Sequence, residues 1–232
     1  MNTSWTPQQL KEIGNQLSHP KGKHGVDVGN RMHESNLSMT LAAIEQLHLM
    51  PNQHVLEIGH GSAKHLPIYF EKASPLLFKG LEISEAMHQA AKQQDSTLAL
   101  EKRYSIDFQL YDGKNIPLED NSIDRIITVN TLYFWKDPLA FCNELYRVLN
   151  TGGFCVVCFA DKSFMEKLPF VQEQFTLYND LIFKDLIKKT DFNLQHLNII
   201  SKEEYVESKT GEKVLRKYYI ACLHKPPYLE HV

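Results

Sequence analysis

The most informative segment of the chain reads His54-Val55-Leu56-Glu57-Ile58-Gly59-His60-Gly61-Ser62-Ala63-Lys64. Its first half is a short apolar run, as expected of a buried strand. The run breaks at Gly59-His60-Gly61, where glycine allows positive φ angles and lets a ligand approach the bare backbone. A helix is expected next, with its first turn near Pro67. This order of strand, glycine turn and helix is a nucleotide-binding arrangement, although the same pattern also occurs without a ligand.

Glu57 limits which nucleotide the turn can receive. A dinucleotide fingerprint reads G-x-G-x-x-G, and Lys64 stands where its third glycine would be. A carboxylate just before the turn would repel a pyrophosphate by about 1 kcal/mol or more at ~4 Å. The carboxylate suits a ligand with a cationic end. The segment therefore argues against a dinucleotide site of the NAD type.

Composition and charge exclude several classes of protein. The 232 residues carry a net charge of −3 with histidine neutral, so no basic excess indicates nucleic-acid binding. One domain is expected at this length. Residues 1–10 lack the apolar core of a signal peptide, and no apolar run approaches the ~20 residues that cross a bilayer. We therefore expect a cytoplasmic protein.

The cysteines do not predict a metal site. Cys155 and Cys158 form a C-x-x-C pair, a spacing that also occurs in metal and redox sites. Residues 154–159 have the composition of a buried strand, on which residues three apart point to opposite faces. We expect these cysteines to be buried hydrophobic residues and expect no metal.

Two helices are expected before the glycine turn. Residues 5–17 have an amphipathic pattern with a capping residue and a proline at the start. A glycine-punctuated loop is predicted over 19–25. The second helix is predicted to begin after Ser35 or Asn36 and to run to about Leu49, because its apolar residues recur in steps of three and four.

A second acid, Glu82, ends the next predicted strand over residues 76–83. It lies ~20 residues past the glycine turn, where doubly wound folds place a ribose-binding acid. A carboxylate there can accept hydrogen bonds from both ribose hydroxyls. Ser84 follows as a helix cap. The alternative is a solvent-facing acid at a strand end.

The third and fourth predicted strands also end on polar or small residues. Residues 106–111 lead into Asp112-Gly113, and the β-branched run 126–129 leads into Asn130. Gly113 also fits a plain turn. Candidate binding residues therefore stand at the ends of four successive strands.

Three consecutive aromatic residues, Tyr133, Phe134 and Trp135, follow the fourth strand. Such a cluster is unusual for a solvated connection. The rings either pack beneath the N-terminal helices or face a ligand, and Tyr133 is the one that we expect to face a substrate.

The last third of the chain predicts an antiparallel end to the sheet. Residues 144–153 read E-L-Y-R-V-L-N-T-G-G and lead into a fifth strand over 154–160. The segments 192–200 and 214–223 are joined by a polar turn over 201–213, and a connection this short pairs strands antiparallel. A dinucleotide-binding fold would continue with another parallel unit instead.

Taken together, these motifs resemble the class I S-adenosylmethionine-dependent methyltransferases. Glu57-x-Gly59-x-Gly61 is similar to motif I of that family, and residues 144–153 are similar to its structural signature E-x-x-R-V-L-x-x-G-G. The resemblance covers 52–223 and is closest to the methyltransferase-11-like group of small-molecule enzymes. It implies an α/β fold, a doubly wound three-layer sandwich whose mostly parallel seven-stranded sheet closes with a C-terminal antiparallel hairpin.

The resemblance implies one methyltransferase domain over 1–232. Within it we expect an N-terminal helical lid over 1–50 and a cofactor-binding core over 51–160. A helical insertion is expected over 161–190 and the C-terminal hairpin over 191–232.

The cofactor implied by the resemblance is S-adenosyl-L-methionine, with S-adenosyl-L-homocysteine as product. Glu57 is expected near its cationic end, Glu82 at the ribose and Asp112 at the adenine amino group. The residues expected to bind the cofactor are Glu57, Gly59, His60, Gly61, Glu82, Ile83, Met87, Asp112, Gly113, Asn130 and Thr131.

The implied function is methyl transfer to an unidentified, small-molecule acceptor, with Tyr133 and Trp135 as substrate contacts. We expect no nucleic-acid partner and no membrane span. His24, His33 and His60 are placed where a general base could act, but no catalytic residue is assigned. Two alternatives stay open: a non-catalytic or polyamine-synthase-like protein that binds an S-adenosyl nucleoside and, less favoured, an NAD(P) oxidoreductase.

Overall fold

The computed structural model describes residues 5–98, 105–171, 173–207 and 213–227. Predictions that concern 1–4, 228–232 and the hairpin tip at 208–212 lie outside these residues. The elements in chain order are α1 (Pro7–Ser18), α2 (Gly22–Glu45), β1 (His54–Ile58), α3 (Leu66–Lys72), β2 (Leu77–Glu82), α4 (Glu85–Leu98), β3 (Ser105–Leu110), β4 (Ile123–Val129), η2 (Leu132–Phe134), α5 (Pro138–Val148), β5 (Leu149–Ala160), α6 (Lys162–Met165), α7 (Asp180–Ile187), η3 (Leu194–His196), β6 (Leu197–Glu207) and β7 (Lys213–His224).

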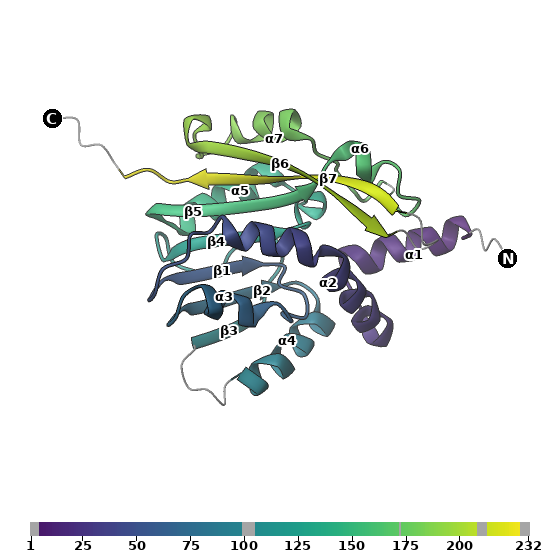
Figure 1. Cartoon of the computed structure of the whole chain (residues 1–232), viewed down its shortest axis with the longest axis horizontal. Coiled ribbons are helices and arrows are strands. Elements are labelled where there is room, and N and C mark those ends of the chain that lie inside the picture. Colours follow the sequence, from purple (N-terminus) through teal and green to yellow (C-terminus); the bar gives the residue numbers. More distant parts are fainter. Residues whose placement is uncertain (1–4, 99–104, 172, 208–212, 228–232) are drawn as a thin grey trace.

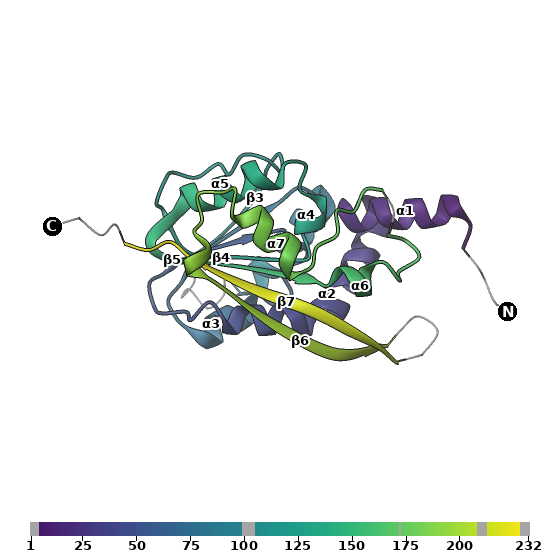
Figure 2. The ribbon, with the colours of Figure 1, turned by 90° about the horizontal axis from the view of Figure 1, so that it is seen from above.

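A seven-stranded sheet in the order β3-β2-β1-β4-β5-β7-β6 forms the centre of the fold (Figure 1). The pairs from β3 to β5 are parallel, and β7 runs antiparallel to both β5 and β6. Helices α2 and α3 cover one face, and α5 and α7 cover the other (Figure 2). The predicted fold class, with its antiparallel end, is confirmed.

The strand order reverses at β1, and this reversal positions the site. Successive units run from β1 out to β3, and the chain then returns to add β4 on the other side of β1. Parallel sheets of this kind bind ligands where their strands end at such a switch point. The polar residues predicted at the ends of these strands therefore lie along one edge of the sheet.

The second helix begins earlier than the sequence predicted. Helix α2 starts at Gly22, so most of the predicted loop over 19–25 is helical, and it ends at Glu45 rather than near Leu49. Its glycines mark close packing instead of a break: a Cβ on Gly25 would lie 2.7 Å from the carbonyl carbon of Pro20. One on Gly29 would lie 2.3 Å from the sulfur of Met87. The backbone contact at Gly25 requires glycine inside a helix that glycine otherwise destabilises, whereas the flexible side chain of Met87 could move away from a Cβ at Gly29.

The two halves of α2 differ in their surroundings. In the second half, Met39, Ala43 and Ile44 are buried in the core of the domain. The first half, with α1, lies over the strand ends where the site forms. We call α1 and the first half of α2, residues 7–36, the N-terminal lid. The lid over 1–50 stays a prediction, and within it the second half of α2 packs in the core.

The C-terminal hairpin is longer than predicted. Residues 201–207 were expected to form a polar turn, but they continue β6 and pair in register with β7, from Leu197 opposite Leu223 to Glu207 opposite Lys213. The outer part of this ribbon extends beyond the rest of the sheet (Figure 2). Exposed and partly buried side chains alternate over 203–207, so one face of the strand is solvated, and the polar residues of this part were mistaken for a turn.

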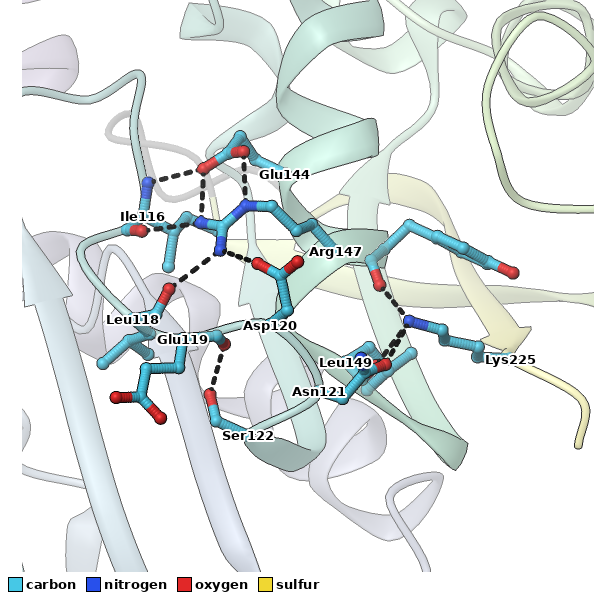
Figure 3. Close-up of polar contacts among 11 residues, drawn as sticks. Ile116, Leu118, Glu119, Asp120, Asn121, Ser122, Glu144, Arg147, Leu149 and Lys225 are labelled. Atoms are coloured by element: carbon cyan, nitrogen blue, oxygen red, sulfur yellow. Dashed lines mark hydrogen bonds and ion pairs between the residues drawn. The ribbon is translucent and has the colours of Figure 1, made fainter.

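The signature at 144–153 has a structural role, as expected (Figure 3). Arg147 donates to both carboxylate oxygens of Glu144, to Asp120 Oδ1 at 2.7 Å, and to the carbonyl oxygens of Ile116 and Leu118 at 2.9 Å. This guanidinium therefore fixes the loop between β3 and β4.

Lys225 holds the other side of the same region. Its Nζ donates at 2.8 Å to Asn121 Oδ1 and to the carbonyl oxygens of Tyr146 and Leu149 (Figure 3). A lysine that enters the protein needs such acceptors, because its charge is costly to bury unpaired. The chain after β7 is thereby tied to the end of α5.

The cysteines are free, and Cys155 and Cys158 are buried in β5. Across the part of the chain that the structure describes, no three histidine, cysteine or acidic side chains gather as metal ligands. Among the same residues, none of the helices combines the length and apolar character needed to cross a bilayer.

Candidate functional site

A cavity lies at the ends of β3, β2, β1 and β4, beneath the N-terminal lid. The strands contribute the residues just past their last hydrogen-bonded position, and the lid contributes Leu17, Met32, His33 and Asn36 from above. Segments far apart in the sequence therefore enclose one space, which is the arrangement expected of a ligand site.

The glycine turn supplies the floor beneath β1. Gly59 and Gly61 have φ angles of 72° and 57°, in the left-handed region that glycine tolerates. A Cβ on Gly59 would lie 2.5 Å from Cγ2 of Thr131, so the loop after β4 packs directly on this turn. A Cβ on Gly61 would meet no atom within 4 Å. The backbone at Gly61 is therefore open to a ligand.

Glu82 is fixed by backbone hydrogen bonds at the end of β2. Its Oε1 accepts from the N–H groups of Ile83 and Ser84 at 2.8 and 3.0 Å, and its Oε2 accepts from Gly61 N at 3.0 Å. The side chain is 6% exposed and lines the cavity. Burial raises the pKa of this carboxyl above its ordinary value, and the three N–H donors oppose that rise. About one lone-pair position is left, on Oε2, for a ligand hydroxyl.

Glu57 lies at the cavity but already has protein partners. The Nε2–H of His65 donates to both of its carboxylate oxygens at 2.9 and 3.0 Å, and the hydroxyl of Tyr69 donates to Oε2 at 3.1 Å. Glu57 is only 3% exposed. The sequence reasoning expected this carboxylate to face the cationic end of the cofactor, but the histidine at the start of α3 neutralises it.

The Glu57–His65 pair is a buried ion pair. Burial alone would raise the pKa of Glu57, but the attraction and hydrogen bond of His65 lower it overall. Burial alone would lower the pKa of His65, and Glu57 raises it overall. Each partner therefore stabilises the charged form of the other.

His60 does not present its ring as a base. Its Nδ1–H donates to the carbonyl of Gly61 at 2.8 Å, and its ring packs on Phe108 with 4.6 Å between ring centroids. The Cδ2 atom of this ring lies 2.6 Å from where a Cβ of Gly80 would be, so that glycine makes room for the ring. Burial lowers the pKa of His60 to about 4. The ring of His60 is packed in the core. Any contact of His60 with the cofactor is therefore expected from its backbone and not from its ring.

At the end of β3, only one of the two predicted residues, Asp112 and Gly113, lines the cavity. Gly113 lines the cavity with a φ of 74°. The carboxylate of Asp112 is not among the cavity-lining groups and accepts instead from the N–H groups of Lys114 and Asn115 and from the side-chain amide of Asn115. Tyr111 lines the cavity in its place. An acid followed by a tight turn is a common Asx-turn sequence, and this turn chemistry takes up the carboxylate.

The loop after β4 contributes Asn130 and Thr131, which were predicted to bind the cofactor and which line the cavity. Asn130 has a φ of 56°, and its Oδ1 accepts from the hydroxyl of Tyr133 at 2.9 Å. Thr131 Oγ1 accepts from the indole N–H of Trp135 at 3.2 Å. These bonds hold the loop in a fixed shape against the glycine turn.

Tyr133 was predicted to contact the substrate, but its side chain is buried outside the cavity. The side chain is 3% exposed and lies outside the cavity lining, with its hydroxyl among Asn130 and the backbone of Ala160. Phe134 and Trp135 line the cavity instead. The loop is a single turn of 3₁₀ helix over 132–134, so consecutive side chains point in different directions. The sequence indicated that three aromatic rings lie near the site, but it did not indicate which of them face the cavity.

Other predicted contacts divide between the cavity and the surface. Ile83 and Met87 line the cavity, and Met87 packs against Gly29 of the lid. His33 lines it from the lid, with its ring stacked on that of His65 at 5.8 Å between centroids. His24 is exposed and lies outside the lining. From the sequence, His33 was named as a possible general base but was assigned no role, because such histidines are more often structural or at the surface.

Comparison with known proteins agrees with this geometry. Residues 56–157 match the family model described as a methyltransferase domain. The chain is 25% identical over 218 residues to a demethylmenaquinone methyltransferase of Lactococcus lactis, covering 93% of this chain and 83% of that protein. It is 29% identical to a malonyl-[acyl-carrier protein] O-methyltransferase of Marinomonas, with 44% of this chain and only 36% of that protein covered.

A relative with a different acceptor is the yeast 18S rRNA (guanine-N7)-methyltransferase, 28% identical with 60% of this chain and 52% of that protein covered. Among solved structures, a phosphoethanolamine N-methyltransferase of Haemonchus contortus in complex with S-adenosylhomocysteine superposes with a TM-score of 0.68. It shares 15% identity, covering 92% of this chain and 60% of that one, and shows the shared fold. In its domain match over residues 56–157 and in its fold, this chain is similar to the class I S-adenosylmethionine-dependent methyltransferases, whose cofactor is S-adenosylmethionine.

Proposed function

We propose that this protein transfers the methyl group of S-adenosylmethionine to a small-molecule acceptor. The observation that carries the proposal is Glu82, a buried carboxylate that three backbone N–H groups hold between the glycine turn and the end of β2. Its free lone-pair position faces the cavity side of a nucleotide-binding edge, where a ribose hydroxyl would donate to it.

In this proposal, the order of the strands determines how the cofactor is oriented along the edge of the sheet. Gly113 and Tyr111 stand at the end of β3 and would border the adenine, with Ile83 beside it. The ribose would lie over Glu82, at the end of β2. The sulfonium and the amino-acid end would then reach the ends of β1 and β4, above Gly61.

The chemistry that the bound cofactor supplies is an in-line displacement with a neutral thioether as the leaving group. The chain therefore has to align the acceptor with the methyl group and exclude water, and an acid is not required for the leaving group. The lid and the ordered loop after β4 fit both tasks, because they close the cavity from opposite sides.

The apolar part of the cavity lining favours an acceptor with an apolar body. Leu17 and Met32 face it from the lid, and Phe134 and Trp135 face it from the loop after β4. Asn36 adds a neutral polar group. The described residues of the lining include no lysine or arginine, and His65 is paired with Glu57, so an anionic acceptor would find no unpaired positive charge there. A neutral acceptor such as a phenol or quinol fits these walls.

Cofactor specificity and turnover test the proposal. Calorimetric titrations should show binding of S-adenosylhomocysteine and no comparable binding of NAD. Transfer of a radiolabelled methyl group should then be measured against neutral quinols, carboxylic acids, phosphorylated amines and ribosomal RNA. Tighter binding of NAD would contradict the cofactor site. Transfer of an aminopropyl group from decarboxylated S-adenosylmethionine would favour the polyamine-synthase-like alternative. Labelling of RNA alone would contradict the small-molecule acceptor and the predicted absence of a nucleic-acid partner.

A further inference from the structure

Among the cavity-lining histidines that the structure describes, His33 is the one that is only half-buried and has no protein partner on its ring nitrogens. Its ring lies on the lid and stacks on His65 with 5.8 Å between centroids and 19° between planes. Within the described part of the chain, no hydrogen bond occupies its ring nitrogens. The side chain is half-buried at the cavity wall. It therefore combines contact with the cavity and unused hydrogen-bonding capacity.

The other charged groups near this wall are already committed. His65 donates to Glu57 and compensates its charge, so neither is available to an incoming ion. His60 has its ring in the core and stays neutral above a pKa of about 4. The described lining contains no lysine or arginine. Among the described lining residues, His33 is the one that can become a cation without a carboxylate already bonded to its ring.

The position of His33 matches one end of the proposed cofactor. With ribose at Glu82, the amino-acid end lies at the end of β1, and Glu57 and His65 mark that place on the wall next to His33. This end of the cofactor carries a carboxylate, which needs a donor when water is excluded. We propose that His33 binds the α-carboxylate of the cofactor as an imidazolium, so that cofactor binding takes up a proton at this ring. The inference rests on the proposed cofactor site.

The charges around His33 give the direction of this proton linkage. Burial lowers its pKa below the ordinary value, and His65 and Lys64 lower it further from the segment before α3. Glu34 on the same helix and Glu57 on β1 act in the opposite direction. In the free protein the ring is therefore neutral near pH 7. A bound carboxylate would raise the pKa of His33, so affinity for the cofactor should fall as pH rises through the pKa of the bound form.

Two ligands that differ only in the carboxylate provide the test. S-adenosylhomocysteine and its decarboxylated analogue, S-adenosyl-3-thiopropylamine, are titrated into the wild type and His33→Gln at pH 6.5, in two buffers of different ionisation enthalpy. The wild type should take up protons with the first ligand only. His33→Gln should lose that uptake and bind S-adenosylhomocysteine about tenfold or more weakly, while binding the analogue as the wild type does.

Two control variants separate this role from general effects. Lys64→Gln removes the exposed cation next to the same wall, and His24→Gln removes an exposed histidine of the same helix. Both should keep the proton uptake and the preference for S-adenosylhomocysteine. If His33→Gln loses affinity for both ligands equally, or if its proton uptake is unchanged, the proposed role of His33 is wrong. The proposed cofactor site would be unaffected by either result. Failure of the wild type to bind either ligand would overturn both.

Discussion

The backbone N–H of Gly61 donates a 3.0 Å hydrogen bond to Oε2 of Glu82, which joins the turn after β1 to the acid at the end of β2. The two residues lie 21 positions apart in the chain, Gly61 in the turn after β1 and Glu82 at the end of β2, the parallel neighbour of β1. The bond orients the carboxylate before any ligand arrives. A preorganised acceptor of this kind reduces the cost of ordering the site on binding.

Replacing Glu82 should weaken cofactor binding and also destabilise the fold. Sequence alone predicted that Glu82→Ala would lower affinity and leave the melting temperature of the free protein almost unchanged. The structure alters the second part, because three N–H donors, one buried and two partly buried, would lose their acceptor. Each unsatisfied donor costs about 1–3 kcal/mol, so the melting temperature should fall. Affinity for S-adenosylhomocysteine should fall roughly tenfold or more, as measured by calorimetry.

Glu82→Gln serves as the matched variant, since it keeps one acceptor oxygen and the shape of the side chain. We expect it to recover part of the lost stability but little of the lost affinity. Unchanged affinity in Glu82→Ala at a temperature where it is folded would mean that Glu82 does not hold the ribose.

Removing His65 should destabilise the protein more than removing both members of its pair. In His65→Phe, the carboxylate of Glu57 stays buried with only Tyr69 as a partner. Breaking a buried pair on one side costs about 3–5 kcal/mol. The double variant Glu57→Gln with His65→Phe should be more stable than His65→Phe alone. Urea unfolding of the four proteins gives this comparison, and simple additivity of the two changes would argue against a coupled pair.

The same pair predicts a pH window for stability. The pKa of His65 is raised, so its contribution is fully present below the ordinary value of 6.5 and is lost as pH rises through the folded pKa. The pKa of Glu57 is lowered, so its contribution is present above the ordinary value of 4.5 and is lost as pH falls through the folded pKa. The stability difference between wild type and the double variant should be largest between these two values. A difference that keeps growing at alkaline pH would contradict the ion pair.

Gly59→Ala should perturb the site through Thr131. The new methyl group would lie 2.5 Å from Cγ2 of Thr131, in addition to the cost of about 1–2 kcal/mol for a positive φ. Gly152→Ala is the control, because Gly152 has a φ of 82° and open space around it. Denaturant unfolding should show a larger loss for Gly59→Ala, and Thr131→Ser should restore part of it. Equal losses in the two glycine variants would mean that the contact with Thr131 is unimportant.

The N-terminal lid should become protected when cofactor binds. Its attachments to the body include the hydroxyl of Ser84, which donates to the carbonyl of Pro20 at 2.6 Å, and the contact of Gly29 with Met87. Hydrogen exchange of residues 21–36 should slow when S-adenosylhomocysteine is added, because closure excludes water from displacement chemistry. The buried second half of α2 should exchange slowly in both states. Equal protection of 21–36 with and without ligand would describe a fixed cap instead of a lid.

Much of this architecture was readable from sequence, because it rests on short-range patterns. The strand and glycine turn around Gly59 and the acid at Glu82 follow from periodicity and backbone chemistry. Tertiary contacts set the rest. Gly25 resembled a loop residue until its contact with Pro20 was known. Glu57 resembled a free ligand, since nothing in a single sequence reports that His65 reaches it.

A crystal structure of the protein with S-adenosylhomocysteine would test the central claim most directly. The account predicts a ribose hydroxyl within hydrogen-bond distance of Glu82 Oε2, the adenine beside Gly113 and Ile83, and the amino-acid end over Gly61 toward His33. A nucleoside bound elsewhere, or one in this cavity with its ribose away from Glu82, would contradict the cofactor site on which the proposed methyl transfer depends.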